Sequence, residues 1–172
     1  MLKNLIGLIF LLIAVGVSAK NRPYTDVVAE LNPSSCPIKK ENIFLTKEQR
    51  KQIEEQSEAK LYGGLALRYI VTCPKEKEVY LYIDSHIVRT LNETVVIKIT
   101  EDKIEEYSVA SFNEPPEYRA PKKWLDQFKG KSGEKVLKAF EDIDALSGAT
   151  LTVGSSINAV NKVLALHKIL KK

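Results

Sequence analysis

Residues 79–109 read VYLYIDSHIVRTLNETVVIKITEDKIEEYSV, and this stretch decides the fold. At the start of residues 79–88, aliphatic side chains alternate with tyrosines, which predicts a strand with two different faces. Two more runs of strand-forming residues, 94–99 and 104–109, are joined by a short polar turn at residues 101–103, which predicts a hairpin. Because strand follows strand with no helix between them, the stretch predicts an antiparallel sheet.

The segments on either side of this stretch add one strand and several helices. Residues 65–72 are rich in strand formers and predict a further strand. Residues 47–59 are strong helix formers that follow a capping-box pattern beginning at Thr46. The prolines within residues 111–118 predict a stiff loop, and residues 120–128 predict a short helix after it. The sequence therefore predicts an α+β fold, a curved antiparallel β-sheet packed with helices.

The composition excludes several classes of protein. A chain of 172 residues, 44% hydrophobic and 28% charged, suits one ordinary globular domain. Two cysteines and two histidines are too few for a zinc ribbon, an iron–sulfur cluster or a haem attachment site, so no metal is predicted. A net charge of +4 does not by itself indicate nucleic-acid binding. The sequence contains neither a Gly-rich dinucleotide loop nor the nucleophile elbow of a serine hydrolase.

The N-terminal part of the chain predicts export. Residues 1–19 contain one lysine, then an uncharged apolar run and small residues, which together predict a secretory signal peptide. An uncleaved anchor helix is the alternative. Residues 20–44, with three prolines, predict an extended lead-in, and residues 45–172 predict a single domain. Export would place Cys36 and Cys73 in an oxidising compartment, where they are candidates for a disulfide; two separate buried thiols are the alternative.

The C-terminal part contains a run of small and hydroxyl-bearing residues, DALSGATLTVGSS, at residues 144–156. A helix is predicted to follow this run to the end of the chain. Gly148 and Ala149 allow a ligand to approach the backbone closely, and free N–H groups at the start of a helix favour a phosphate. Ordinary helix capping is the alternative interpretation. The hydroxyls that would receive the phosphate belong to Thr150, Thr152, Ser155 and Ser156.

The arrangement Asp144-x-x-Ser147-Gly148-Ala149-Thr150 resembles the flavinylation signature of the FMN-binding domain family. That family includes the C subunit of the sodium-translocating NADH:quinone reductase and the G subunit of Rnf electron-transport complexes. The resemblance implies that a flavin transferase joins FMN, through its phosphate, to Thr150, and Thr152 fits the usual continuation of the signature. The resemblance extends from about residue 60 to the end. It implies that the single domain predicted at residues 45–172 is an FMN-binding domain.

Upstream segments at residues 84–90, 92–94 and 111–118, with Trp124 after them, resemble a compact exported subgroup of the same family. From their positions and chemistry, we expect contacts with FMN from His86, Arg89, Thr90, Glu93, Glu114 and Tyr118. Tyr118, Phe112 and Trp124 are candidate aromatic walls for the isoalloxazine ring. For the charged residues, an exposed position or a structural ion pair is the alternative, and Glu114 has the further alternative of binding backbone amides. For Trp124, the alternative is a place in the core.

The resemblance implies an exported electron-transfer flavoprotein with FMN as a covalent cofactor, located in the periplasm or on the extracytoplasmic face of a membrane. It would pass electrons between redox proteins, with a membrane electron-transport complex among the candidate partners. Such a protein is a redox carrier rather than a stand-alone enzyme, and it is itself the acceptor substrate of the flavin transferase. The alternative is a flavin-free, extracytoplasmic domain of the same fold that binds a ligand or another protein.

Overall fold

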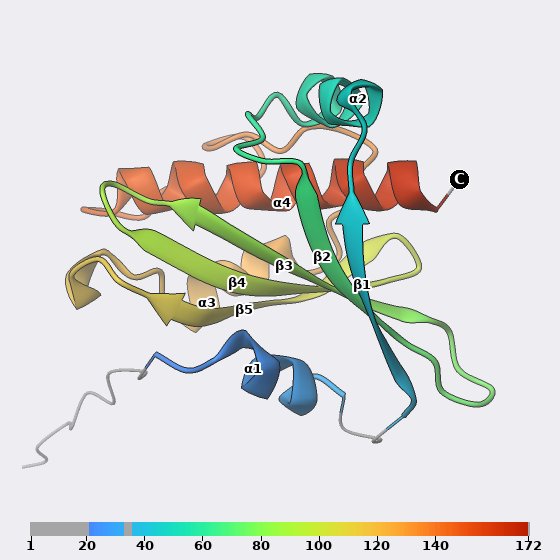
Figure 1. Ribbon diagram of the computed structural model, residues 1–172. Coiled ribbons are helices and arrows are strands. Elements are labelled where there is room, and N and C mark those ends of the chain that lie inside the picture. The colour runs from blue at the N-terminus through green and yellow to red at the C-terminus, as the bar shows by residue number, and fades with distance from the viewer. Residues whose placement is uncertain (1–20, 33–35, 172) are drawn as a thin grey trace, which may run out of the picture.

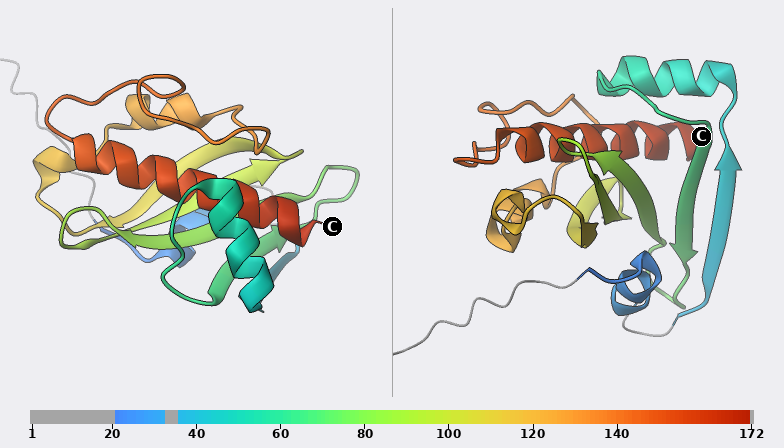
Figure 2. Two further views of the ribbon diagram at one scale, coloured as in Figure 1. Left: turned by 90° about the horizontal axis from the view of Figure 1, so that it is seen from above. Right: turned by 60° about the vertical axis from the view of Figure 1, so that its left-hand side comes forward.

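In the part of the chain that the structure describes, five antiparallel strands form a single sheet, and neighbours in the sheet are also neighbours in the chain. The computed structural model describes residues 21–32 and 36–171, so the expected signal peptide at residues 1–19 lies outside the described residues. Figure 2 shows how strongly the sheet twists from one edge to the other. The strands are β1 (Ile38–Phe44), β2 (Leu65–Val71), β3 (Val79–Ile87), β4 (Asn92–Thr100) and β5 (Lys103–Phe112).

Helices cover both faces of the sheet. The long C-terminal helix α4 lies along one face, α2 stacks over α4, and the short α1 lies on the opposite face (Figure 1). The helices are α1 (Tyr24–Glu30), α2 (Lys47–Ser57), α3 (Lys122–Leu125) and α4 (Thr150–Leu170), with single 3-10 turns at η1 (Pro116–Tyr118) and η2 (Asp126–Phe128). This arrangement confirms the predicted α+β fold with an antiparallel sheet. Within residues 21–32 and 36–171, no helix is both long and apolar enough to cross a membrane.

The alternation of side chains along the strands builds two cores. In β4, Ile97 and Ile99 are fully buried in the cluster beneath α4 and α2, while Val96 is fully buried against α1. In β3, Tyr82 belongs to the α4 cluster and Leu81 to the α1 cluster, as the predicted two-faced strand requires. A sheet covered on both sides needs apolar residues on both faces, which explains the nearly continuous apolar run in β4.

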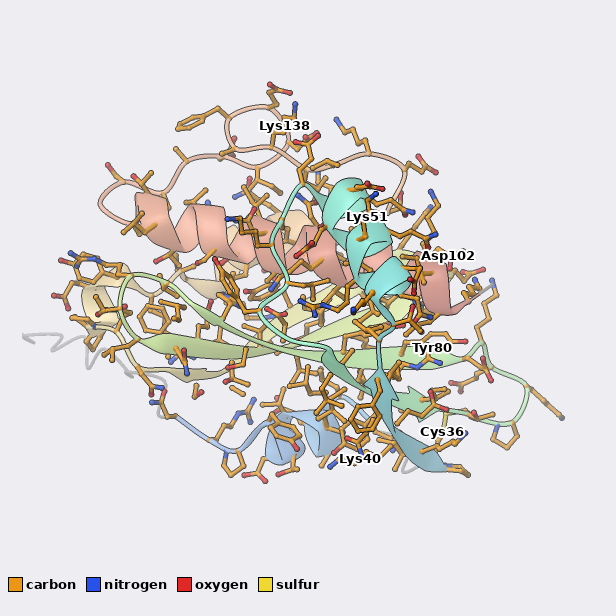
Figure 3. All side chains as sticks on the ribbon, turned by 45° about the horizontal axis from the view of Figure 1, so that its top comes forward. Cys36, Lys40, Lys51, Tyr80, Asp102 and Lys138 are labelled. Carbon is orange, nitrogen blue, oxygen red and sulfur yellow. A yellow bond between two sulfur atoms is a disulfide. The ribbon has the colours of Figure 1, made fainter. Side chains whose placement is uncertain are left out.

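Two local predictions agree closely with the structure. The Thr46 hydroxyl accepts the Gln49 backbone N–H, and the Gln49 side chain accepts the Thr46 N–H, so the capping box starts α2. The β4–β5 turn is made by Glu101 and Asp102, both with positive φ, as a two-residue hairpin turn requires. His167 of α4 is buried between the Tyr82 hydroxyl and Asp102. Figure 3 labels Asp102 and Tyr80 near the end of that helix.

Two segments differ from the sequence-based expectation. Residues 20–44 were expected to be an extended lead-in, but they contain helix α1 and strand β1. Helix α1 forms because Val27 and Val28 are buried against the sheet, a tertiary contact that its weak local pattern does not reveal. Ser111 and Phe112, expected in a stiff loop, instead complete β5, because β4 continues far enough to pair with them.

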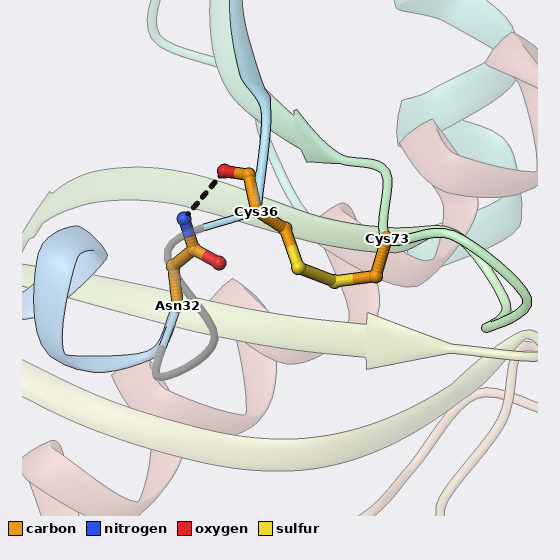
Figure 4. The surroundings of a disulfide bond; sticks show 3 residues. All are labelled: Asn32, Cys36 and Cys73. Carbon is orange, nitrogen blue, oxygen red and sulfur yellow. Dashed lines mark hydrogen bonds between the residues drawn. A yellow bond between two sulfur atoms is a disulfide. The ribbon is translucent and has the colours of Figure 1, made fainter.

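The two cysteines meet at the edge of the α1 face. Cys36 lies just before β1 and Cys73 just after β2, and the structure joins them in a disulfide with their Cα atoms 5.2 Å apart. The Asn32 side chain donates a hydrogen bond of 3.0 Å to the Cys36 carbonyl (Figure 4). The disulfide ties the start of β1 to the β2–β3 connection, and the hydrogen bond from Asn32 adds the end of α1. The alternative of two separate thiols is therefore wrong.

Candidate functional site

The loop before α4 is held so that Thr150 becomes the first residue of the helix. The Trp124 indole N–H donates to the Asp144 carbonyl at 2.9 Å, and the Asp144 N–H donates to the Gln127 side chain at 2.9 Å. Gly148 has a φ of +77°, a left-handed conformation that favours glycine over other residues. The chain then turns at Ala149 and α4 begins at Thr150.

The start of α4 offers an exposed hydroxyl beside free backbone donors. Thr150 is exposed, whereas Thr152 is buried and donates its hydroxyl proton to the Tyr118 carbonyl at 2.6 Å. Within the described part of the chain, no side chain caps this helix, so its first N–H groups are not occupied by a cap. Ordinary N-capping by a hydroxyl, the alternative given above, is therefore not what these residues do. Of the two threonines, Thr150 is therefore the one whose hydroxyl is available to a ligand.

A small hollow lies at this helix end. It has a volume of about 280 Å³ and is lined by residues 148–152 together with Arg89 and Tyr118. The Arg89 guanidinium lies over the Tyr118 ring, 4.6 Å from its centroid, which fixes the cation beside the hollow. A guanidinium and the positive end of a helix dipole both attract a phosphate group. The hollow can therefore hold a phosphate next to the Thr150 hydroxyl.

A larger cavity of about 840 Å³ also borders Thr150. Its walls come from the loop between α2 and β2, from the end of β3 with the turn after it, and from α4. Thr150, Leu151 and Arg89 line both the cavity and the small hollow, so the two spaces meet at the start of α4. The residues that line the larger cavity beyond these three are Glu58, Ala59, Lys60, Tyr62, Ser85, His86, Ile87, Val88, Asn92, Gly154, Ser155, Asn158 and Lys162.

One wall of the cavity is a stripe of α4, and exposed apolar side chains surround its mouth. Thr150, Gly154 and Asn158 follow one another at intervals of four residues and form one stripe of α4. A Cβ atom added at Gly154 would meet nothing within 4 Å, so the helix surface there is open. Around the mouth, Tyr62 is 92% exposed and Ile87 is 62% exposed. Exposed apolar side chains gathered at one cavity are typical of a surface that a ligand covers.

A chain of four charged side chains lies along the side of this cavity. Lys162 donates to both carboxylate oxygens of Asp84, at 3.0 and 3.3 Å. His86 directs Nδ1 to Asp84 at 2.8 Å and Nε2 to Glu93 at 3.0 Å. The pairing follows from local structure, because Asp84 and His86 are two residues apart on β3 and Glu93 lies opposite His86 on β4. Lys162 and His86 line the cavity, and the two carboxylates lie behind them.

The geometry makes His86 a cation. Both ring nitrogens contact carboxylates, which only accept hydrogen bonds, so both nitrogens must carry protons. Burial lowers the pKa of His86, but the hydrogen bonds to Asp84 and Glu93 outweigh burial and raise it to about 9. For Asp84, burial raises the pKa, and the contacts with His86 and Lys162 reverse this and hold it below its ordinary value. Near neutral pH, Asp84 is therefore ionised and His86 is protonated.

Glu114 fixes the turn that carries Arg89. One oxygen of its buried carboxylate accepts the backbone N–H groups of Arg89, Thr90 and Leu91, at 3.0, 2.6 and 2.8 Å. These backbone donors lower the pKa of Glu114. Glu114 and Thr90 are thus part of the support for Arg89, and neither lines the cavity or the hollow.

The structure brings together only some of the residues expected to contact a ligand. Gly148, Ala149, Thr150, Thr152, Arg89, Tyr118 and His86 line one or both spaces. The residues that line neither space are Asp144, Ser147, Thr90, Glu93 and Glu114. Ser156 is fully buried, which excludes it as a phosphate ligand.

Two of the three candidate aromatic residues line neither the cavity nor the hollow, and the core position given as the alternative for Trp124 is confirmed. Phe112 and Trp124 are buried away from the cavity, and Trp124 packs edge-on against Phe128 in the core. Tyr118 remains, at the small hollow. The sequence reasoning also missed Tyr62, Lys60 and Lys162. Lys162 lies twelve residues, or three steps of four, after Thr150 along a predicted helix, and this spacing was the signal that pointed to it.

Comparisons with known proteins agree with the phosphate-binding geometry. Residues 91–165 match the family model described as FMN-binding domain. This segment contains β4, β5, the loop that ends in Gly148 and most of α4, whereas the β3 and Tyr62 walls of the cavity precede it. No curated protein and no solved structure gave a significant match. Within residues 21–32 and 36–171, no group of His, Cys, Asp or Glu side chains is arranged to hold a metal ion.

Proposed function

Residues 91–165 belong to the FMN-binding domain family, and from this premise we propose that the chain is an exported electron carrier with FMN attached covalently to Thr150. The attachment would be a phosphodiester between the Thr150 hydroxyl oxygen and the FMN phosphate. The family assignment supports FMN as the cofactor. The covalent bond, the electron transfer and the export belong to the proposal and are argued from the residues below.

The observation that carries the proposal is the position of Thr150 at the junction of two spaces. On one side is the small hollow with Arg89 and the uncapped start of α4, which suits the phosphate. On the other side is the cavity of about 840 Å³, which suits a large planar ring. A ligand joined to the exposed Thr150 hydroxyl by its phosphate can therefore extend its ring directly into the cavity.

The cavity walls match the chemistry of a flavin ring. The exposed apolar rim formed by Tyr62, Ile87 and Leu151 would be covered by the ring, which removes apolar surface from water. The open surface at Gly154 leaves room for the ring against the helix. Flavin supplies the capacity to accept and release electrons, and the protein supplies binding, orientation and the local charge.

Two features of the chain support a role outside the cytoplasm. The predicted signal peptide at residues 1–19 and the Cys36–Cys73 disulfide both fit an oxidising, extracytoplasmic compartment. A phosphodiester would also keep a soluble cofactor from diffusing away after export. The proposed partners are a flavin transferase, which would modify Thr150, and redox proteins that exchange electrons with the bound flavin, including those of a membrane electron-transport complex.

The test is the intact mass of protein made with an active flavin transferase. We expect wild-type protein to gain the mass of one FMN less one water, and Thr150→Ala to gain nothing. Ser155→Ala is the matched control, because Ser155 is a hydroxyl residue of the same helix that also lines the cavity. It should be modified like wild type. An unmodified wild-type protein beside a modified known acceptor would favour the flavin-free binding domain instead.

A further inference from the structure

The ionisable side chains that line the large cavity are mostly basic. Lys60, His86, Arg89 and Lys162 line it, against a single acidic residue, Glu58. The carboxylates of Asp84 and Glu93 balance His86 and Lys162 in total charge, but they lie behind them and do not line the cavity. A ligand in the cavity therefore meets the cations first, and negative charge on that ligand is favoured.

Of these cations, Lys162 is the best placed to contact the end of a ligand that lies farthest from Thr150. Its side chain is only 11% exposed and is held against Asp84, so the ammonium group has a defined position. An ammonium has three N–H donors, and the two contacts with Asp84 leave at least one for a group in the cavity. Lys162 lies twelve residues after Thr150, about 18 Å along the helix axis. That distance suits an extended ribityl chain followed by the isoalloxazine ring.

The other basic residues have different surroundings. Arg89 stacks over Tyr118 beside the small hollow, close to the attachment point. Lys60 is exposed in the loop after α2, where water screens its charge. His86 has both nitrogens engaged by carboxylates and has no donor left for a ligand. Its charge instead keeps Asp84 ionised as the partner that positions Lys162.

Resting on FMN attachment at Thr150, we propose that Lys162 contacts the pyrimidine edge of the flavin ring and favours its reduced, anionic form. Asp84 and His86 are positioning residues that hold the Lys162 ammonium at the cavity wall. Reduction adds two electrons, from a redox partner or a chemical reductant, and one proton from solvent, so the ring gains one negative charge. A fixed cation in a partly buried site stabilises that charge and raises the reduction potential.

The test is the midpoint potential of flavin-loaded protein, measured by spectroscopic titration with dithionite. We expect Lys162→Met to make reduction at least tenfold less favourable, a decrease of about 30 mV for a two-electron couple. Lys162→Arg keeps the charge and should retain most of the wild-type potential. Lys168→Met is the matched control, because Lys168 is an exposed lysine of α4 outside the cavity, and its potential should equal that of wild type.

The outcomes separate this inference from the attachment proposal. An unchanged midpoint potential in flavin-loaded Lys162→Met protein would overturn the role of Lys162. A fall in thermal stability would not rescue that role, because a purely structural ion pair affects stability alone. A wild-type protein without FMN would instead defeat the attachment proposal and this inference with it. If Lys162→Met does not fold, Lys162→Gln keeps a donor for Asp84 without the charge and gives the same comparison.

Discussion

Alkaline pH is expected to weaken the fold through His86. Its pKa rises from 6.5 in the unfolded chain to about 9 in the folded protein, so the folded state holds the proton more tightly. The stabilisation is fully present below pH 6.5 and is lost as the pH rises through 9. Each pKa unit corresponds to about 1.4 kcal/mol, so the shift corresponds to about 3 kcal/mol of unfolding free energy. This loss should occur between pH 6.5 and 9.

The assay is guanidinium unfolding of unmodified protein at pH values from 6 to 9.5, for wild type and for His86→Gln. The difference in unfolding free energy between the two proteins should shrink by about 3 kcal/mol over this interval, because the variant lacks the titrating group. Using the difference removes contributions from groups that titrate equally in both proteins. His86→Gln also removes the cation that contacts both Asp84 and Glu93, so it should be the less stable protein at neutral pH.

The other histidine provides the control. Burial lowers the pKa of His167, and its hydrogen bond to Asp102 offsets this only in part. The folded state therefore favours neutral His167, and its contribution is present above pH 6.5 and lost as the pH falls. Because the chain has two histidines, two imidazole signals can be followed by NMR and assigned with the single variants. An imidazole signal of His86 that titrates at or below pH 6.5 would refute the reasoning.

Two further predictions concern the disulfide and the cavity floor. Replacing Cys36 and Cys73 by Ala together opens a loop with a sequence separation of 37 residues, and chain entropy then predicts a loss of about 4 kcal/mol, measurable by guanidinium unfolding. A loss below about 1 kcal/mol would contradict the entropic estimate. Gly154→Leu should fold normally, since leucine favours helices and a Cβ there meets no atom within 4 Å. The leucine side chain should nevertheless displace the flavin ring and change the visible circular dichroism of the flavin. Gly154→Ala is the smaller control, and a wild-type spectrum for the leucine variant would place the ring elsewhere.

The sheet could be predicted because each strand of residues 79–109 carries its own local pattern. The β3 alternation and the β4–β5 turn are properties of neighbouring residues, and the structure has both. Helix α1 could not be predicted in this way. It is seven residues long, and its two buried valines matter only because the sheet has a second face to cover.

The attachment motif could likewise be identified from sequence, while most of the cavity could not. Thr150, Gly148 and Ala149 are adjacent in the chain, and the helix start follows from their order. The cavity is assembled from Tyr62, the end of β3 and Lys162, which are up to 100 residues apart. Aromatic residues near the motif were expected as ring walls, but burial in the core is the more favourable place for Trp124.

The most direct test of the account is to locate the flavin on a peptide. Cleavage after lysine releases residues 139–162, which contain Thr150 and the other hydroxyl residues of the motif. Tandem mass spectrometry of this peptide, from protein made with the flavin transferase, assigns the modified residue. We predict one FMN phosphodiester on Thr150. FMN on Ser147, Thr152 or Ser155, or a peptide without FMN, would contradict it.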